Sequence, residues 1–208
     1  MVRLLAVTKT QPPSAVEAAY SAGLRSFGEN YVQEAVDKKA ALAQAAPGIQ
    51  WHLIGPLQSN KTRVVAQAFD WVHTVDRGKI ARRLSEARAD GVPSLNVLIQ
   101  VNVSGESTKS GVPPAEAPAL AHEVAKLPRL RLRGLMAIPE PTPDRNLQLE
   151  RFRAVRELFD RLNAEGLALD TLSMGMSQDL ESAIAEGATM VRIGTAIFGE
   201  RPKAKEAA

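Results

Sequence analysis

The chain has 208 residues, of which 45% are hydrophobic and 24% charged, with a net charge of +3 and a pI near 9.3. A chain of this length can bury a full core, so one domain is the default. The absence of cysteine excludes disulfides, thiolate metal sites and a cysteine nucleophile. No apolar run approaches the roughly 20 residues that span a membrane, and no signal peptide opens the chain. We therefore expect a cytoplasmic protein with no membrane partner.

The mildly basic charge does not indicate a nucleic-acid partner. Lysine and arginine are interleaved with acidic residues, except in residues 129–133, where arginines alternate with leucines. That alternation is typical of a strand entering a core, with solvated charges around its start. Aromatic residues that could stack on bases make up only 4% of the chain.

Short apolar runs alternate with alanine-rich amphipathic segments along the whole chain. The apolar runs, each predicted to be a strand, are residues 4–7, 26–27, 51–54, 71–75, 95–103, 132–137, 169–173 and 190–193. The helical patterns between them are residues 13–22, 31–46, 61–68, 78–89, 114–127, 145–165 and 178–186. This alternation favours parallel strands with right-handed crossovers. Eight such strands predict an α/β fold, a (β/α)8 TIM barrel, whereas the doubly wound alternative lacks a Gly-x-Gly-x-x-Gly turn after its first strand.

Several helical patterns carry start and stop signals. Ser14 with Glu17 resembles a capping box, and Ser177 stands three residues before Leu180. Four glycines follow helical patterns, where a left-handed cap is expected: Gly23, Gly91, Gly166 and Gly187.

We expect a single domain over residues 1–201 and a polar tail over residues 202–208. Residues 103–114 are predicted to be a loop without core residues that could act as a lid. A covering helix is missing both before the first strand and after the eighth, so one flank of the barrel is expected to be exposed or covered by a partner.

Lys9 is the first candidate for chemistry because it directly follows the first apolar run. A lone lysine after a strand is usually a solvated surface group. In a barrel, however, residues just past the strand ends face the active site. Burial there would favour the neutral amine, which can form a Schiff base with an aldehyde.

A second group of candidates suits an anion. Ser173, Ser177, Gly194 and Thr195 come from the ends of the seventh and eighth predicted strands, where barrels frequently bind phosphate. The alternative is that Ser177 only caps the next helix. An amine and an anion site together are what a phosphorylated aldehyde requires, which points to pyridoxal 5′-phosphate (PLP).

Arg192 lies inside an apolar run, so its charge must be paired if it is buried. It could form a structural salt bridge, or it could face the ring nitrogen of PLP. An arginine there would keep that nitrogen unprotonated and weaken the cofactor as an electron sink.

Further candidates follow the second and third strands. Asn30 could donate a hydrogen bond to the phenolic oxygen of the cofactor. His52 could be a core histidine or a catalyst, while Asn60 and Lys61 could attract an anion or simply start a helix.

Five ordered motifs together resemble the pyridoxal-phosphate homeostasis protein family, a single-domain relative of the alanine racemase N-terminal barrel. They are LAVTKT (5–10), GENY (28–31), HLIGPLQSNK (52–61), SMGMS (173–177) and RIGTAIFG (192–199), and the resemblance covers residues 3 to about 201. It implies a fold-type III PLP barrel, with Lys9 as the Schiff-base lysine and Arg192 at the ring nitrogen. It also implies a phosphate site formed by Ser173, Ser177, Gly194 and Thr195, with Asn30 in the pocket and Asn60 and Lys61 in a nearby loop.

What the resemblance implies about function is storage or delivery of PLP, without an established catalytic reaction. PLP-dependent client enzymes would then be partners, and the protein would be a monomer or a weak dimer. One departure is the lack of the family's usual N-terminal helix, the natural candidate for the missing flank.

Two alternatives remain open. The first is a PLP-dependent racemase or decarboxylase of the same fold. Racemisation needs proton donors on both faces of the cofactor, and the two tyrosines of this chain, Tyr20 and Tyr31, fall on early helical segments. The second is a partner-binding module that uses the exposed flank.

Overall fold

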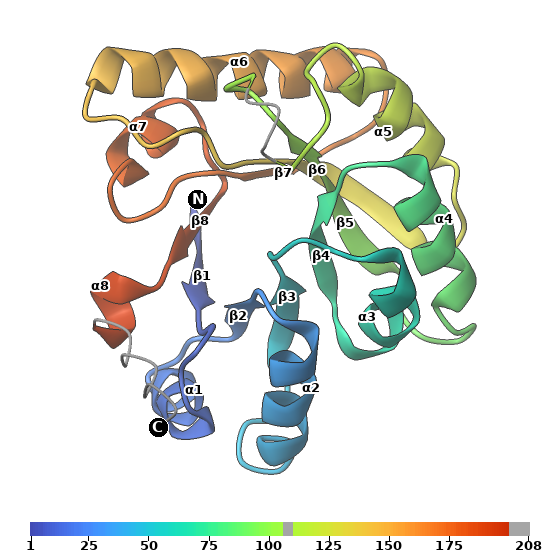
Figure 1. Ribbon diagram of the computed structural model, residues 1–208, viewed down its shortest axis with the longest axis vertical. Helices are drawn as coiled ribbons and strands as arrows, with labels where there is room; N and C mark the ends of the chain where they lie inside the picture. The colour runs from blue at the N-terminus through green and yellow to red at the C-terminus, as the bar shows by residue number, and fades with distance from the viewer. Residues whose placement is uncertain (106–109, 200–208) are drawn as a thin grey trace, which may run out of the picture.

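The computed structural model describes residues 1–105 and 110–199. These residues form eight parallel strands that pair in chain order and close into a barrel, with β1 beside β8 (Figure 1). The strands are β1 (Arg3–Val7), β2 (Ser26–Glu29), β3 (Gln50–Leu53), β4 (Trp71–Val75), β5 (Leu95–Val101), β6 (Leu130–Ala137), β7 (Thr171–Ser173) and β8 (Met190–Ile193). The predicted (β/α)8 barrel is confirmed.

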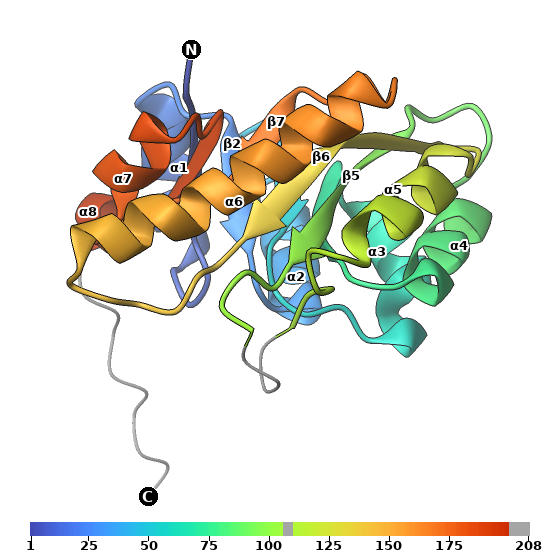
Figure 2. The ribbon, with the colours of Figure 1, turned by 90° about the horizontal axis from the view of Figure 1, so that it is seen from above.

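Helices follow the strands and surround the barrel, and the longest of them, α6, crosses beside β6 and β7 (Figure 2). They are α1 (Pro13–Ser21), α2 (Val32–Ala41), α3 (Thr62–Ala68), α4 (Gly78–Ala87), α5 (Ala117–Ala125), α6 (Arg145–Ala164), α7 (Leu180–Ala185) and α8 (Thr195–Phe198), with a 3₁₀ turn, η1 (Ser59–Lys61), before α3. Alternation of apolar and amphipathic segments therefore located every strand and the first seven helices.

The predicted helix starts are partly wrong. Helix α1 begins at Pro13, and neither Pro12 nor Ser14 provides a side-chain cap, because the proline at the first helical position already fixes the backbone there. Helix α7 begins at Leu180, so Ser177 lies outside it. Three of the four glycine caps are confirmed, since Gly23, Gly166 and Gly187 directly follow the C-caps of α1, α6 and α7 and have positive φ angles. Gly91 also has a positive φ but lies three residues beyond Arg88, the C-cap of α4, so it does not cap that helix.

The loop after β5 also differs from expectation. Val112 bridges to Val101 and is buried in the core, so this segment does contribute a core residue. The lid predicted over residues 103–114 falls partly on residues 106–109, which lie outside the described residues, as does the predicted tail at residues 202–208.

The core has two layers. A large apolar layer fills the space between the sheet and the helices, and a small cluster of Trp71, Leu98 and Met136 lies apart from it. Strand register places Arg192 beside Leu5 and His52 beside Gly28, which puts these polar side chains on the inner face of the barrel. The inside of the barrel therefore holds polar side chains as well as this small apolar cluster.

The amino end of the barrel is closed by Trp71, which is buried. The guanidinium carbons of Arg3 and Arg133 lie 5.5 and 4.8 Å from the centre of the Trp71 ring system. Arg133 is paired with Asp170, and Arg3 donates to the Thr171 hydroxyl at 3.1 Å. Aromatic stacking of two cations, balanced by one carboxylate, thus seals this end.

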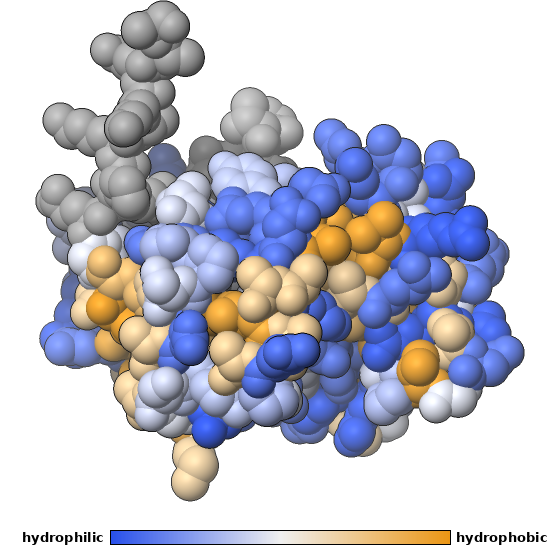
Figure 3. All heavy atoms as spheres, turned by 90° about the horizontal axis from the view of Figure 1, so that it is seen from below, coloured by the Kyte–Doolittle hydropathy of each residue, from blue (hydrophilic) through white to orange (hydrophobic). Residues whose placement is uncertain are grey.

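Contrary to expectation, a helix does follow the eighth strand, but α8 has only four residues. Among the described residues, the flank between β1 and α8 is therefore only partly covered, and Leu4 on β1 and Ile197 on α8 keep 38% and 37% of their surface exposed. On the face shown in Figure 3, hydrophilic residues separate several small apolar patches. Within the described ranges, every helix is too short or too polar to cross a membrane.

We predict that Gly134→Ala destabilises the barrel. Gly134 has φ +151°, and a Cβ there would collide with the Thr171 carbonyl oxygen across the β6–β7 pair. Urea unfolding should show a loss of more than about 1 kcal/mol. Gly166→Ala is the matched control, because Gly166 also has a positive φ but has open space around its Cβ position. Equal losses in the two variants would contradict the proposed collision.

Candidate functional site

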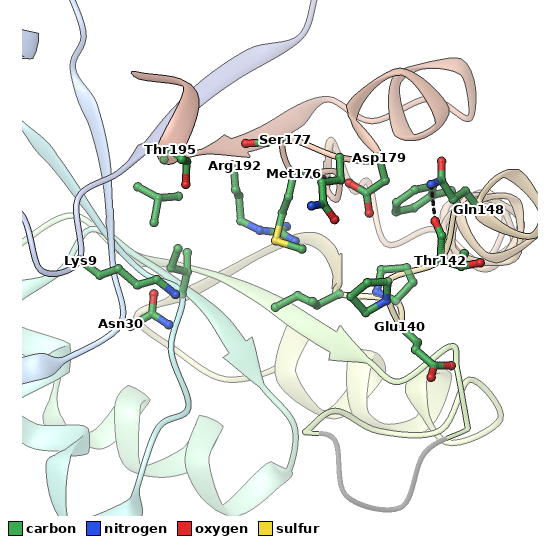
Figure 4. Close-up of a pocket in the computed structure, with 18 of the residues that line it drawn as sticks. Lys9, Asn30, Glu140, Thr142, Gln148, Met176, Ser177, Asp179, Arg192 and Thr195 are labelled. Atoms are coloured by element: carbon green, nitrogen blue, oxygen red, sulfur yellow. Dashed lines mark hydrogen bonds between the residues drawn. The ribbon is translucent and has the colours of Figure 1, made fainter. Parts of the chain in front are cut away.

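A cavity of about 300 Å³ opens at the carboxyl ends of the strands. Its wall comes from segments that follow β1, β2, β3, β6, β7 and β8, together with α6. Figure 4 shows how the side chains that line the cavity lie, among them Lys9, Asn30, Met176, Ser177, Asp179, Arg192 and Thr195. This is the end of the barrel at which enzymes of this architecture bind their ligands.

Lys9 and Asn30 form one wall of the cavity. Lys9 lies two residues beyond the end of β1 and is half-buried, and its amine end lies beside the Asn30 amide (Figure 4). The Asn30 Oδ1 atom is buried without a hydrogen-bond partner. An unpartnered amide oxygen at the wall of a cavity can accept a hydrogen bond from a bound ligand, and the amide nitrogen beside it can donate one.

The position of Asn30 depends on the missing side chain of Gly55. A Cβ at Gly55 would collide with the Asn30 carbonyl oxygen, so only glycine lets the loop after β3 approach so closely. Thr74 fixes that loop from below by donating its hydroxyl to the Gly55 carbonyl at 2.8 Å.

Arg192 reaches the cavity from inside the barrel. It is 3% exposed, and its guanidinium donates to the Ser173 carbonyl at 2.6 Å, the Ser173 hydroxyl at 2.9 Å and the Ala137 carbonyl at 2.9 Å. Burial lowers the pKa of Arg192 to about 10, and Asp179 acts in the opposite direction. The side chain therefore stays charged at neutral pH, held by neutral oxygen acceptors.

Behind Arg192, a chain of neutral groups runs down the barrel. Ser173 Oγ lies 3.0 Å from His73 Nδ1, and His73 Nε2 lies 3.0 Å from His52 Nδ1. A guanidinium can only donate, so the Ser173 hydroxyl is free to donate to His73, and His73 in turn to His52. Burial lowers the pKa of both histidines, that of His52 to about 3, which keeps the two rings neutral.

Ser177, Gly194 and Thr195 form the wall on the β7 and β8 side (Figure 4). Asp179 accepts the Met176 N–H at 2.6 Å and so fixes the loop that carries Ser177. Gly194 runs close to β1, since a Cβ there would lie 3.3 Å from the Val7 carbonyl oxygen. The Ser177 and Thr195 residues are both exposed, as groups that meet a ligand must be.

The structure brings six of the ten candidate residues to the cavity and leaves four away from its wall, one of which is Lys61, exposed at the end of η1. Lys9, Asn30, Ser177, Arg192, Gly194 and Thr195 line it. Ser173 is buried beneath it as a support for Arg192, and His52 stacks on Trp71 with ring centroids 5.2 Å apart. Asn60 is exposed and lines a separate hollow with Arg63 and Arg83.

Sequence reasoning missed three residues that shape the site: His73, Asp179 and Gly55. His73 is the second residue after Trp71 in β4, so strand periodicity could have placed it beside His52 on the inner face. Asp179 directly precedes α7, a position typical of helix-capping residues. Gly55 gave no signal, because the close approach that it permits involves a loop whose path the sequence does not determine.

The sequence is also similar to those of known proteins. The sequence matches the family described as "Alanine racemase, N-terminal domain" over residues 1–202. A "Pyridoxal phosphate homeostasis protein" of Pseudomonas aeruginosa is 63% identical over 200 residues, which are 96% of this chain and 85% of that protein. The chain belongs to the pyridoxal phosphate homeostasis protein family. This is the family that the five motifs indicated.

Two solved structures of PipY, a COG0325 family member from Synechococcus elongatus PCC7942, also align with the chain. The structure without PLP has a TM-score of 0.90 at 40% identity and covers 95% of this chain and 93% of that one. The structure with PLP bound has a TM-score of 0.87 at 39% identity and covers 95% and 92%.

The neutral histidines predict an acid-sensitive fold. The pKa of a histidine in the unfolded chain is near 6.5, so between pH 7 and pH 5 only the unfolded state gains these protons, and stability falls as pH falls. Each histidine should contribute a loss of about 2 kcal/mol over that range. Urea unfolding at both pH values measures it, and His52→Asn/His73→Asn should flatten the dependence. A double variant as acid-sensitive as the original would contradict the assignment.

Proposed function

We propose that this protein binds pyridoxal 5′-phosphate in the cavity, covalently on Lys9, and serves to store or deliver the cofactor inside the cell. The observation that carries the proposal is that an amine, an orphaned amide and a buried guanidinium meet at one cavity: Lys9, Asn30 and Arg192. The names of the relatives and the PLP-bound PipY structure support the same ligand.

The residues present fit this cofactor. When bound, pyridoxal phosphate supplies an aldehyde that condenses with an amine and releases water. Lys9 would provide the amine, Asn30 would donate its amide N–H to an oxygen of the ring, and Arg192 would donate to the ring nitrogen. Ser177, Gly194 and Thr195 would hold the phosphate from the opposite wall. Ser173 would act through Arg192, and the positions of His52 and Asn60 support no direct contact.

The proposal includes no catalytic reaction of its own. Arg192 cannot give up its proton readily, so it would keep the ring nitrogen unprotonated and oppose carbanion formation. Neither tyrosine is in place to act as a second proton donor. Tyr20 donates its hydroxyl to the Pro47 carbonyl at 2.7 Å, and Tyr31 is 58% exposed and outside the cavity wall.

PLP-dependent enzymes that lack their cofactor are the partners that such a role requires. We propose that they receive PLP from a monomer or a weak dimer of this protein. Mixing the loaded protein with an apo-enzyme, and following the appearance of its activity with and without an excess of a PLP trap, would separate direct transfer from release into solution.

Lys9→Ala should abolish covalent loading. Borohydride reduction of the PLP-loaded protein, followed by peptide mapping, should place the label on Lys9 in the original chain and remove it in the variant. Lys39→Ala is the control, because Lys39 lies on α2 outside the cavity and donates to the Ala68 carbonyl. A label on another side chain, or no label in the original protein, would contradict the proposed site.

A further inference from the structure

A buried lysine, Lys38, contacts the residue that precedes Lys9. Lys38, on α2, is 4% exposed and does not line the cavity. Its ammonium donates to three oxygens: the Thr8 carbonyl at 2.6 Å, Glu29 Oε1 at 2.8 Å and Glu34 Oε1 at 2.6 Å. Three acceptors satisfy every proton of an ammonium group, so Lys38 is held completely.

These partners grip the peptide on both sides of Lys9. On the amino side, Lys38 binds the Thr8 carbonyl, and Glu29 accepts the Thr8 hydroxyl at 2.6 Å. On the carboxyl side, Glu34 accepts the Thr10 N–H at 2.6 Å. We call Glu29, Glu34 and Lys38 the clamp.

The turn that the clamp holds is strained. Thr10 has φ +63°, a left-handed conformation that a β-branched residue rarely adopts. Such a conformation persists only where surrounding contacts impose it, and it typically occurs at functional sites. Within the turn, the Gln11 N–H donates to the Thr8 carbonyl at 3.0 Å and the Thr10 hydroxyl to the Lys9 carbonyl at 2.6 Å, and the Glu34 hydrogen bond holds the Thr10 N–H from outside the turn.

Joining a helix to a strand through the clamp costs free energy, because its charges are buried. Glu29 is fully buried, its Oε2 atom has no hydrogen-bond partner, and burial raises its pKa against the opposing effect of Lys38. An apolar contact of similar volume would stabilise a fold at least as well as such a buried ion pair. What the charges add is a fixed direction for the chain between Thr8 and Thr10.

We propose that Lys38, with Glu29 and Glu34, is a positioning residue for Lys9: the clamp fixes the turn so that the Lys9 amine enters the cavity beside Asn30. This inference rests on the proposed function, because it concerns how readily Lys9 is loaded. The alternative is that the clamp only attaches α2 to the barrel.

Covalent loading and folding can be measured separately. The charge-balanced double variant Lys38→Met/Glu29→Gln removes both buried charges, and Lys39→Met, one position along the same helix, is its control. After mixing with PLP, borohydride quenching at set times gives the rate at which Lys9 becomes labelled. Circular dichroism and thermal melting of the unloaded protein report the fold.

We expect labelling of Lys9 to be at least about tenfold slower in the double variant than in the original or Lys39→Met, with a cooperative melting transition retained. In a Lys9→Ala background, the same double substitution should leave non-covalent PLP binding, measured by equilibrium dialysis, unchanged. Labelling at the original rate in a folded double variant would overturn the inference, as would an equal loss of non-covalent binding.

A milder variant decides the question if the double variant fails to fold. Glu34 keeps 28% of its side chain exposed, so Glu34→Ala is tolerated more easily, yet it removes the acceptor of the Thr10 N–H. Asp37→Ala, which breaks only an exposed contact with Gln33, is its control. Slower labelling in Glu34→Ala alone supports the clamp, and equal rates overturn it. If the original protein itself carries no label on Lys9, the proposed function fails instead.

Discussion

The charge of Arg192 inside the barrel is the constraint on which the rest of the site depends. A buried guanidinium must have acceptors, and here they are the carbonyls of Ser173 and Ala137 at the ends of β7 and β6 and the Ser173 hydroxyl. These bonds tie three neighbouring strands together at their carboxyl ends. Burial is the main reason why the two histidines below are neutral, and the positive charge of Arg192 lowers the pKa of His73 further.

The two ends of the proposed ligand site are thus held by different means. On the Arg192 side, a cation is fixed by neutral acceptors and a column of uncharged rings. On the Lys9 side, the chain itself is fixed by an ion-paired lysine on α2. At Arg192 the acceptors are neutral oxygens, which suits a group that must meet an anionic cofactor.

Much of the fold follows from the sequence, because apolar runs and amphipathic segments alternate regularly. β4 and β8 were located to the residue, whereas β2 was predicted to end at Phe27 although it continues to Glu29. The reason is that Glu29 is a buried carboxylate in a strand, and its partner Lys38 belongs to the following helix. Local patterns give no sign that two charged residues will neutralise each other in the core.

The same limit applies to the site. Lys9 and Arg192 could be placed because position relative to a strand end determines which face of a barrel a residue reaches. His52 and Asn60 could not, because the pleat of β3 turns His52 toward Trp71, and η1 carries Asn60 out to the α3–α4 surface. The motifs group residues that are neighbours in the sequence. Only the path of the folded chain shows which of them line the cavity, which support it from beneath and which lie on the surface.

The closed amino end restricts how a ligand can enter and leave the barrel. Trp71 lies beneath Arg3 and Arg133, and the buried column from His52 to Arg192 lies above it, so the described side chains fill the barrel below the cavity. A molecule that enters the cavity must therefore leave through the same opening, at the carboxyl ends of the strands. An enzyme that takes a ligand directly from this cavity would have to dock at the carboxyl ends of the strands, not at the amino end of the barrel.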